Sequence, residues 1–295
     1  MHRIYTIMFF VSLTIFAGSV FVLVFYGLNF GVDFKGGSLM EIEFTDIRPD
    51  VSEIQKVFSD RFSSLEVSLN PIGERGLIIR SGEISEQDHQ EILGNIRTEF
   101  EANKFEEKRF DSIGPAVGKE LRDKSFIAIG IMLAAIACYI TFVFRKLSGT
   151  LSLLAMNVST LVALLHDIVI PMGIFAILGH YYNVQISGVF VAAVLTILGY
   201  TVSDKVVIFD RVRENILRGS KEDLGAIVHK SVMQTLVRSI NNTLTVILSS
   251  AAIYLFGGES IRYFALALMI GVFLGAYSSI FVASPLLVWW SRWSR

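Results

Sequence analysis

Hydrophobic residues gather into six long runs along this chain, and each run is long enough to cross a lipid bilayer as a helix. A membrane-spanning helix needs about 20 mostly apolar residues, because it rises about 1.5 Å per residue through about 30 Å of hydrocarbon. The runs cover residues 7–28, 126–144, 151–171, 186–209, 241–256 and 264–290. The pattern predicts an α-helical integral membrane protein with six transmembrane helices.

Two of these runs admit a second interpretation. The run at 241–256 is the shortest and most polar, so a re-entrant segment there would reduce the number of spans to five. The first run follows Met1, His2 and Arg3, as a secretion signal would. It is longer than the apolar region of a typical signal, and no Ala-x-Ala pattern closes it. We therefore interpret it as an uncleaved anchor.

A polar segment separates the first run from the second. Residues 31–124 hold 13 Lys and Arg and 20 of the 27 Asp and Glu. Their apolar periodicity predicts strands at 38–45, 65–72, 76–81 and 105–111 and helices at 50–62 and 85–102. We place Pro71, Gly73 and Gly76 in the turn between the middle strands, and Ser85 at a helix N-cap with Asp88 in the capping-box position.

The order βαββαβ predicts a ferredoxin-like α+β domain over residues 30–124. Residues 1–29 then form the N-terminus and first transmembrane helix, and residues 125–295 form a five-helix transmembrane bundle. The polar domain contains no nucleophile–base pair and no metal-ligand spacing. Since a fold alone supplies no chemistry, we interpret it as a docking or gating module.

Basic residues beside the spans predict the orientation, because cytoplasmic loops are enriched in Lys and Arg. With the N-terminus inside, the two short outer loops at 179–185 and 257–263 hold only Arg262. The inner segments hold Arg3, Arg145, Lys146, Arg211, Arg213, Arg218, Lys221, Lys230, Arg292 and Arg295. We expect both termini in the cytoplasm, residues 30–124 in the periplasm, and the chain in the bacterial inner membrane.

Composition narrows the function classes. The chain of 295 residues is 53% hydrophobic and 18% charged, which argues against a soluble enzyme. The formal net charge of -1 gives no basic bias towards nucleic acid. Cys138 is the one cysteine, and the five histidines are scattered. We therefore predict no enzymatic activity, no metal, no cofactor and no nucleic-acid partner.

Ionisable residues inside the spans carry the strongest functional signal, because a charge in hydrocarbon costs about 2.5–3.5 kcal/mol on insertion scales. The third run contains Asp167, the fourth contains Asp204 and Lys205, and Arg238 precedes the fifth. Polar stripes accompany them: Asn157 and Thr160 with Asp167; Tyr200 and Thr201 with Asp204; Asn241, Asn242, Thr245 and Ser249 with Arg238. The Ser, Thr and Asn members also suit plain interhelical hydrogen bonding.

The two charged residues of the fourth run, Asp204 and Lys205, differ in whether their side chains can reach water from their depth in the membrane. Asp204 lies about 9 Å from the inner end of its predicted helix, at about 1.5 Å per residue. From there Lys205 can reach the cytoplasmic interface, whereas the shorter Asp204 must be neutral, paired or hydrated. An Asp204 that alternately meets and leaves Arg238 would bind and release a proton. Pro171 removes the helix hydrogen bond to the Asp167 carbonyl, as a functional kink or an ordinary membrane proline.

Several segments together resemble the SecF family of the bacterial protein-export machinery. They are FGVDFKGG at 30–37, IGPAVGKEL at 113–121, the pair His166-Asp167, the stretch 196–215, and the segments 234–243 and 271–285. One departure is Ser203-Asp204-Lys205, where the family commonly has Asn-Asp-Thr. The aspartate is retained, and the added lysine puts the proton affinity in question.

The resemblance implies a function and partners. The family pairs with the related subunit SecD, resembles exporters of the resistance–nodulation–division superfamily, and assists the SecYEG channel in moving unfolded polypeptides outward at the expense of the proton gradient. It ties the residues at Asp204 and Arg238 to proton flow, and we add Asp167 to this predicted relay. Hinge candidates flank the polar domain at Gly31, Gly36, Gly37, Gly114 and Gly118, and Gly271 and Gly275 predict close helix packing.

Three other functions compete with this prediction. Asp167 and Asp204 could form the dyad of an intramembrane aspartyl protease, although the GxGD signature of that class is absent. The chain could be half of a proton-coupled small-molecule exporter, although its short loops offer no obvious pocket. It could also be a passive scaffold that holds SecD in the bilayer without moving protons.

Overall fold

A computed structural model describes residues 3–62, 65–101, 103–145, 152–219 and 222–293. The predicted helix end at Ala102, the predicted span start at Leu151 and the basic residues Lys146, Lys221 and Arg295 lie outside the described residues. The chain divides into two compact units. One comprises Met1–Asn29 with Phe126–Arg295, and the other comprises Phe30–Ser125.

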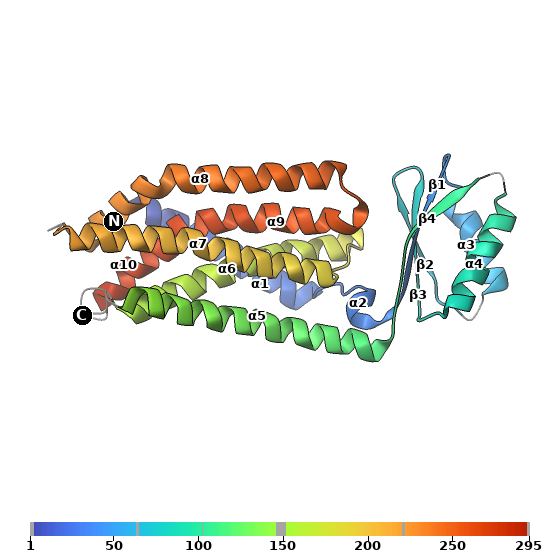
Figure 1. Cartoon of the computed structure of the whole chain (residues 1–295), viewed down its shortest axis with the longest axis horizontal. Coiled ribbons are helices and arrows are strands. Elements are labelled where there is room, and N and C mark those ends of the chain that lie inside the picture. The colour runs from blue at the N-terminus through green and yellow to red at the C-terminus, as the bar shows by residue number, and fades with distance from the viewer. Residues whose placement is uncertain (1–2, 63–64, 102, 146–151, 220–221, 294–295) are drawn as a thin grey trace. The chain divides into compact units, whose positions relative to one another are not determined.

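Six helical segments in the described residues are long and apolar enough to cross a membrane, which confirms the predicted class. They are shown in Figure 1 as α1 (Arg3–Tyr26), α5 (Pro115–Phe144), α6 (Leu153–Tyr182), α7 (Gly188–Leu217), α8 (Leu224–Phe256), and a last segment made of α9 (Glu259–Ser278), the π-helical turn η2 (Ser279–Ala283) and α10 (Ser284–Trp293). The start of α1 and the end of α10 lie at the same end of this unit.

The spans are longer than the apolar runs that predicted them. Helix α8 has 33 residues and begins at Leu224, so the five-span alternative with a re-entrant segment is wrong. Helix α6 continues through Pro171 to Tyr182. The predicted loops at 179–185 and 257–263 therefore shrink to 183–187 and 257–258. Apolar runs mark only the lipid-compatible part of a helix, and these helices continue through polar residues at their ends.

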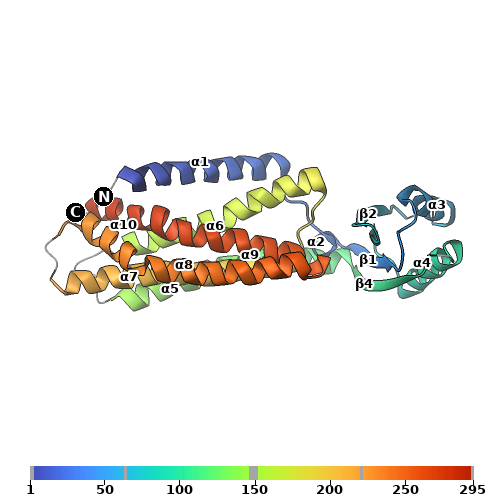
Figure 2. The same ribbon diagram turned by 90° about the horizontal axis from the view of Figure 1, so that it is seen from above.

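Helix α9 is the central element of the helical unit. It packs against α6, α7 and α8, while α1 lies against α6 (Figure 2). Helix α5 is held in this unit by long side chains. The ring centroids of Phe144 and Phe209 are 6.4 Å apart, and the Asn157 amide donates to the Thr141 hydroxyl at 2.9 Å. The two buried charged residues of α7, Asp204 and Lys205, lie in the part of the unit where α6, α8 and α9 surround α7.

The second unit has the predicted ferredoxin-like topology. Its elements are α2 (Val32–Lys35), β1 (Gly37–Phe44), α3 (Val51–Arg61), β2 (Ser68–Ile72), β3 (Gly76–Ser81), α4 (Glu86–Glu99) and β4 (Phe105–Ile113). The four strands form an antiparallel sheet in the order β2-β3-β1-β4. Pro71 lies within β2 opposite Leu77, and Gly76 opens β3, so the predicted turn is too wide. An edge strand accommodates proline because its missing N–H can face outward.

Alternation along β1 places the core on one face of the sheet. Met40, Ile42 and Phe44 are buried, whereas Glu43 is exposed. Helices α3 and α4 cover the buried face through Ile54 and Phe58 and through Ile92, Leu93 and Ile96. Period two in the strand and period 3.6 in the helices bring these apolar side chains into one cluster.

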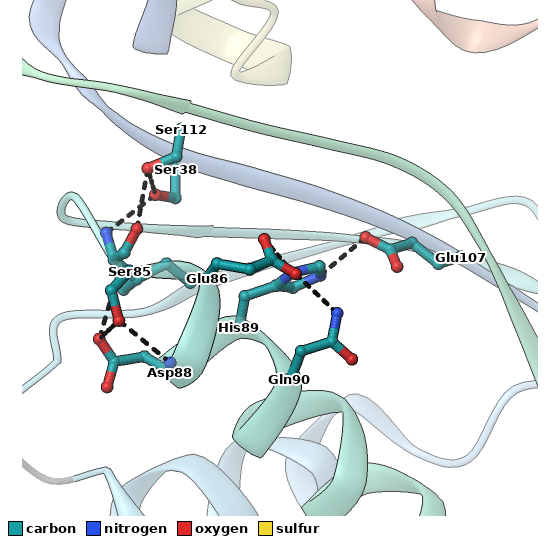
Figure 3. Close-up of polar contacts among 9 residues, drawn as sticks. Ser38, Ser85, Glu86, Asp88, His89, Gln90, Glu107 and Ser112 are labelled. Carbon is teal, nitrogen blue, oxygen red and sulfur yellow. Dashed lines mark hydrogen bonds and ion pairs between the residues drawn. The ribbon is translucent and has the colours of Figure 1, made fainter.

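Polar contacts fix the start of α4 (Figure 3). Ser85 and Asp88 form the predicted capping box, and hydrogen bonds from the Ser85 hydroxyl and backbone lower the pKa of the Asp88 carboxyl. The buried His89 ring stacks on Phe110 with centroids 3.7 Å apart, and its Nε2 lies 2.8 Å from a carboxylate oxygen of Glu107. Helix α4 is thereby attached to β4 by both an apolar and a polar contact.

The glycines that the sequence offers as hinges lie at crowded positions. Gly36 has φ +81°, and a Cβ there would lie 2.7 Å from Pro115 Cα. A Cβ on Gly118 would lie 2.8 Å from the Gly36 nitrogen, and one on Gly37 would lie 2.7 Å from the Ser81 oxygen. Gly31 precedes α2, and a Cβ on Gly114 would approach Glu83 to 3.3 Å. These glycines let the turn before β1 pack directly on the first turn of α5; hinge motion there stays a prediction.

We predict that Gly118→Ala destabilises the chain by about 1–3 kcal/mol, because the added methyl overpacks a backbone contact. The matched control is Gly94→Ala in α4, where an added Cβ would meet nothing within 4 Å. The control should be neutral or stabilising by up to about 1 kcal/mol through helix propensity. Thermal unfolding of the detergent-purified chain measures both. Equal midpoints for the two variants would contradict the packing role of Gly118.

Candidate functional site

A fully buried ion pair joins α6 to α7. Lys205 Nζ lies 2.7 Å from Asp167 Oδ2, and both side chains have 0% exposure. The same ammonium donates to the Thr201 carbonyl at 3.3 Å. The expectation that Lys205 reaches the cytoplasmic interface is therefore wrong. A buried carboxylate on a neighbouring helix compensates the ammonium at depth, so the side chain has no need to extend towards water.

The pair belongs to a network across four helices. His166 Nδ1 lies 3.2 Å from Asp167 Oδ1, and His166 Nε2 lies 2.7 Å from the hydroxyl of Ser12 on α1. The Ser278 hydroxyl of α9 also hydrogen-bonds to the Asp167 carboxylate. Every polar atom of the Asp167 side chain therefore has a donor. Buried polar networks of this kind are stable only when each member is satisfied.

Asp204 points towards a different helix from its neighbour. The Ser239 hydroxyl of α8 donates to Asp204 Oδ2 at 2.9 Å, and the residue is 7% exposed. Among the described residues, no Lys, Arg or His forms an ion pair with this carboxylate. Asp167 and Asp204 are thus both buried acids, but within the described residues only Asp167 forms an ion pair with a cation.

Helix α8 carries two polar faces, and the polar stripe predicted from the sequence is the outer one. The predicted stripe is exposed and consists of Arg238, Asn241, Asn242, Thr245 and Ser249. The face buried in the unit consists of Ser231, Thr235, Ser239, Thr243 and Ser250. Hydroxyl residues at every fourth position from 231 to 243 were the signal for this second face. Ser239, the partner of Asp204, was therefore missed.

Arg238 does not contact Asp204 in this structure. Because Ser239 bonds to Asp204, the preceding residue Arg238 lies at a similar depth, but its side chain points about 100° away from Ser239 and is exposed. Within the described part of the chain, Arg238 makes no ion pair. The predicted encounter between the two residues is not formed here.

The other residues of the predicted polar stripes also differ in where they lie: some are near the buried acids and others contact different helices. Thr201 is fully buried, and Tyr200 is half-buried one helical turn from Asp204. The Asn157 amide donates to Thr141 on α5 and to the Leu153 carbonyl, and so it faces away from the Asp167 network. Asn157 and Asp167 are ten residues apart, which at about 100° per residue is about 80° short of three full turns. Their side chains therefore point about 80° apart around the axis of α6.

Two glycines bring α9 against the part of α7 that precedes Asp204. A Cβ on Gly271 would overlap the side chain of Ile197, and one on Gly275 would overlap Thr201. These contacts leave no room for a larger residue at either position. The GxxxG spacing therefore sets the backbone approach of α7 and α9 directly above the ion pair.

The described residues contain no group of three or more His, Cys, Asp or Glu that could hold a metal ion. The polar centre of the bundle thus consists of two acids, a lysine, a histidine and several hydroxyls. Such groups can hold, orient and transfer protons.

Comparison with known proteins identifies the family. Residues 93–293 match the family model described as protein export membrane protein SecD/SecF, C-terminal, and residues 21–46 match the SecD/SecF GG motif, which includes Gly36 and Gly37. The chain belongs to the SecD/SecF family. This confirms the resemblance noted in the sequence, and the close-packed glycines are the family's own motif.

Curated relatives named protein translocase subunit SecF match almost the whole chain. The relative from Thermobaculum terrenum is 40% identical over 95% of this chain and 90% of its own length. The relative from Anaerolinea thermophila is 36% identical over 96% of this chain and 91% of its own length. These names describe a transport component of the protein-export system.

Solved structures share the fold. The crystal structure of SecDF from Thermus thermophilus, titled a translocon-associated membrane protein, superposes with a TM-score of 0.82 at 27% identity and covers 99% of this chain. A SecDF structure in a super-membrane-facing form gives a TM-score of 0.67 at 28% identity. This chain spans only 39% of the first SecDF chain and 38% of the second.

We predict that the ion pair stabilises the chain only as a pair. Lys205→Met should destabilise it by about 3–5 kcal/mol, because Asp167 is left buried without a counter-charge. The double change Asp167→Asn with Lys205→Met should be nearly neutral, since Asn retains an acceptor for His166 and Ser278. The control Lys108→Met removes an exposed lysine that pairs with Glu43 and Glu106 and should cost less than about 1 kcal/mol. Denaturation of the purified chain compares all three; a double variant as unstable as the single one would contradict the prediction.

Proposed function

We propose that this chain works with a SecD subunit to draw on the proton-motive force and assist late steps of protein translocation through SecYEG. Its substrate is then an unfolded polypeptide, and its transported ion is the proton. The family membership supports the Sec export role, and the relatives' names support a transport component in preference to an enzyme. The chemistry of the helical unit supports the proton.

Asp204 is the observation that carries the proposal. It is a carboxyl group buried among membrane helices with a neutral hydroxyl as its hydrogen-bond donor and no ion-pair partner in the described residues. A carboxylate in hydrocarbon is stable only when it is neutral, paired or hydrated. A group in this position exchanges a proton whenever its access to water changes. Each proton that crosses releases about 2.3 kcal/mol per 100 mV, so a few protons per cycle suffice for a domain movement.

The exposed face of α8 supports a membrane partner. Arg238, Asn241, Asn242 and Thr245 are polar residues on the outside of a helix that is otherwise apolar enough to span the bilayer. An arginine near the centre of a helix costs about 2.5–3.5 kcal/mol when lipid surrounds it. A second polytopic subunit that covers this face removes the cost. SecD is the proposed partner, since the matching structure is titled SecDF and this chain covers 39% of that longer chain.

The same surface gives Arg238 its proposed place in the relay. Arg238 lies at a similar depth to Asp204, but its side chain is exposed and points about 100° away from Ser239 around the axis of α8. Rotation or displacement of α8 against a partner would bring the guanidinium towards the carboxylate and favour release of its proton.

The proposed location is the bacterial inner membrane, with both termini in the cytoplasm and residues 30–124 in the periplasm. The start of α1 and the end of α10 lie at the same end of the bundle, as six crossings require (Figure 1). Described basic residues at the inner ends, such as Arg145, Arg211 and Arg218, follow the positive-inside rule.

We predict that Asp204→Asn abolishes the gradient-driven component of export while the subunit still assembles, because Asn keeps the Ser239 contact but binds no proton. The control is Asp210→Asn, the same change on the same helix at an exposed carboxylate that pairs with Arg213. Export of a secretory precursor into inverted membrane vesicles, with and without a proton gradient, measures the effect. Unchanged export in Asp204→Asn would favour the passive scaffold. Cleavage of a membrane substrate lost in both Asp167→Asn and Asp204→Asn would favour the protease.

We also predict that the polar face of α8 contacts SecD. After Cys138→Ser removes the native thiol, Asn242→Cys should crosslink to co-expressed SecD with a short bifunctional thiol reagent. Phe21→Cys is the control, since Phe21 is 65% exposed on the apolar face of α1. Adducts are detected by their size in denaturing gels. A thiol at 242 that gives no SecD adduct, with SecD still co-purifying, would place the interface elsewhere.

A further inference from the structure

Two consecutive charged residues of α7 bind to different helices. Asp204 accepts a hydrogen bond from α8, and Lys205 pairs with Asp167 of α6. Consecutive residues point about 100° apart around a helix axis. A single orientation of α7 about its axis therefore allows Asp204 to contact α8 and Lys205 to contact α6. A change in that orientation would disturb both contacts together.

The contacts on the two sides of α7 differ in strength. Towards α6 and α9, α7 has the buried ion pair and the backbone approach at Gly271 and Gly275. Towards α8, the buried residues around the contact at Asp204 are the small hydroxyls Thr235, Ser239 and Thr243, and Ser239 donates to the carboxylate. Two further hydrogen bonds to α8, from the Asn215 amide to Ser231 and Gln234, lie nearer the connection between the two helices. Close packing and a buried charge pair resist displacement, whereas a seam of small polar groups separates more easily.

We propose that the Asp167–Lys205 ion pair is a fixed positioning device that locks α7 to α6, holds Asp204 on the α8 side, and carries no transported proton. The inference rests on the proposed function, because it assigns the exchange of protons to Asp204 alone among these acids. Under this proposal Asp167 is not a member of the proton relay, although the sequence predicted that it would be. Movement that exposes Asp204 occurs between α7 and α8, and the α6–α7–α9 contact stays closed.

The surroundings of Asp167 support its fixed state. Lys205, His166 and Ser278 donate to its carboxylate, and they come from α7, α6 and α9. Protonation of Asp167 would require Lys205 to leave, which breaks the contact between two helices. Asp204 has a single neutral donor of this kind, so it can lose and regain a proton without such a rearrangement.

The pair also sets the electrostatic surroundings of Asp204. The titratable or charged groups of the described residues around the pair and Asp204 are Lys205 and Tyr200 of α7, Asp167 and His166 of α6, Tyr277 of α9 and, on the outer side, Arg238 of α8. Lys205 and Asp167 both act on Asp204, with opposite signs. As long as the pair is intact, the ammonium of Lys205 and the carboxylate of Asp167 form a unit without net charge.

The test compares Asp167→Asn, Lys205→Met and the double variant, each co-assembled with SecD and SecYEG in vesicles. The readout is the pH dependence of gradient-driven export. The double variant has lost the lock but holds no uncompensated charge, so it should keep its response to the gradient and the same midpoint, while the rate of export falls. Asp167→Asn leaves a cation beside Asp204 and should shift the midpoint to lower pH, and Lys205→Met should shift it to higher pH, each by about 1 unit. A merely structural pair would change the amount of assembled subunit without opposite shifts of the midpoint.

A double variant that assembles but no longer responds to the gradient would overturn the proposal, because a member of the pair would then carry a transported proton. Asp204→Asn, measured in parallel, separates this outcome from failure of the proposed function. If Asp204→Asn keeps its gradient dependence, the proton-coupling function itself fails.

A second measurement does not depend on assembly of the double variant. Infrared spectra of the unaltered chain and of Asp204→Asn are recorded in the carboxylic-acid stretching region across the pH range of the export profile. The proposal predicts one buried carboxylic-acid band that titrates in this range and is absent from Asp204→Asn. A titrating buried band that persists in Asp204→Asn and disappears in Asp167→Asn would assign a transported proton to Asp167.

Discussion

The cost of placing charge in hydrocarbon governs the centre of this bundle. Asp167 and Lys205 meet that cost by pairing, at 2.7 Å and without exposure to solvent. The pairing determines how α7 faces its neighbours and therefore leaves Asp204 towards the hydroxyls of α8. Without a carboxylate at 167, the ammonium of Lys205 would be buried without a counter-charge. The arrangement of both acids thus follows from one electrostatic requirement.

Much of the fold was predictable because it depends on periodicity. Apolar runs located six spans, and alternation along residues 38–44 with the Ser85–Asp88 cap identified the ferredoxin-like unit. Helix ends were less predictable, since α8 begins 17 residues before its apolar run. For the site, the sequence predicted which charged residues lie inside the spans, but only part of their contacts. Asp204 and Lys205 are adjacent in sequence, and only the packing of α6 and α8 shows that they serve different partners.

Glycine has one physical role in both units of this chain. At Gly36 and Gly118, as at Gly271 and Gly275, a missing side chain lets two backbones approach more closely than any larger residue allows. In this chain, Gly36 of the family's GG motif therefore forms a close backbone contact between the turn before β1 and the first turn of α5. The second glycine pair holds α9 on α7 beside the ion pair, so close backbone packing and charge pairing stabilise the same part of the bundle.

Pro71 affects how the sheet of the second unit can pair with other extended chains. It occupies the edge strand β2, where it removes one of the outward N–H groups that an extended peptide would need. The opposite edge strand, β4, carries Glu106, Lys108 and Asp111 along its length. A passing polypeptide therefore finds no continuous backbone template at either margin of the sheet. The sheet is thereby protected at both edges against forming mixed β-sheet aggregates with other chains.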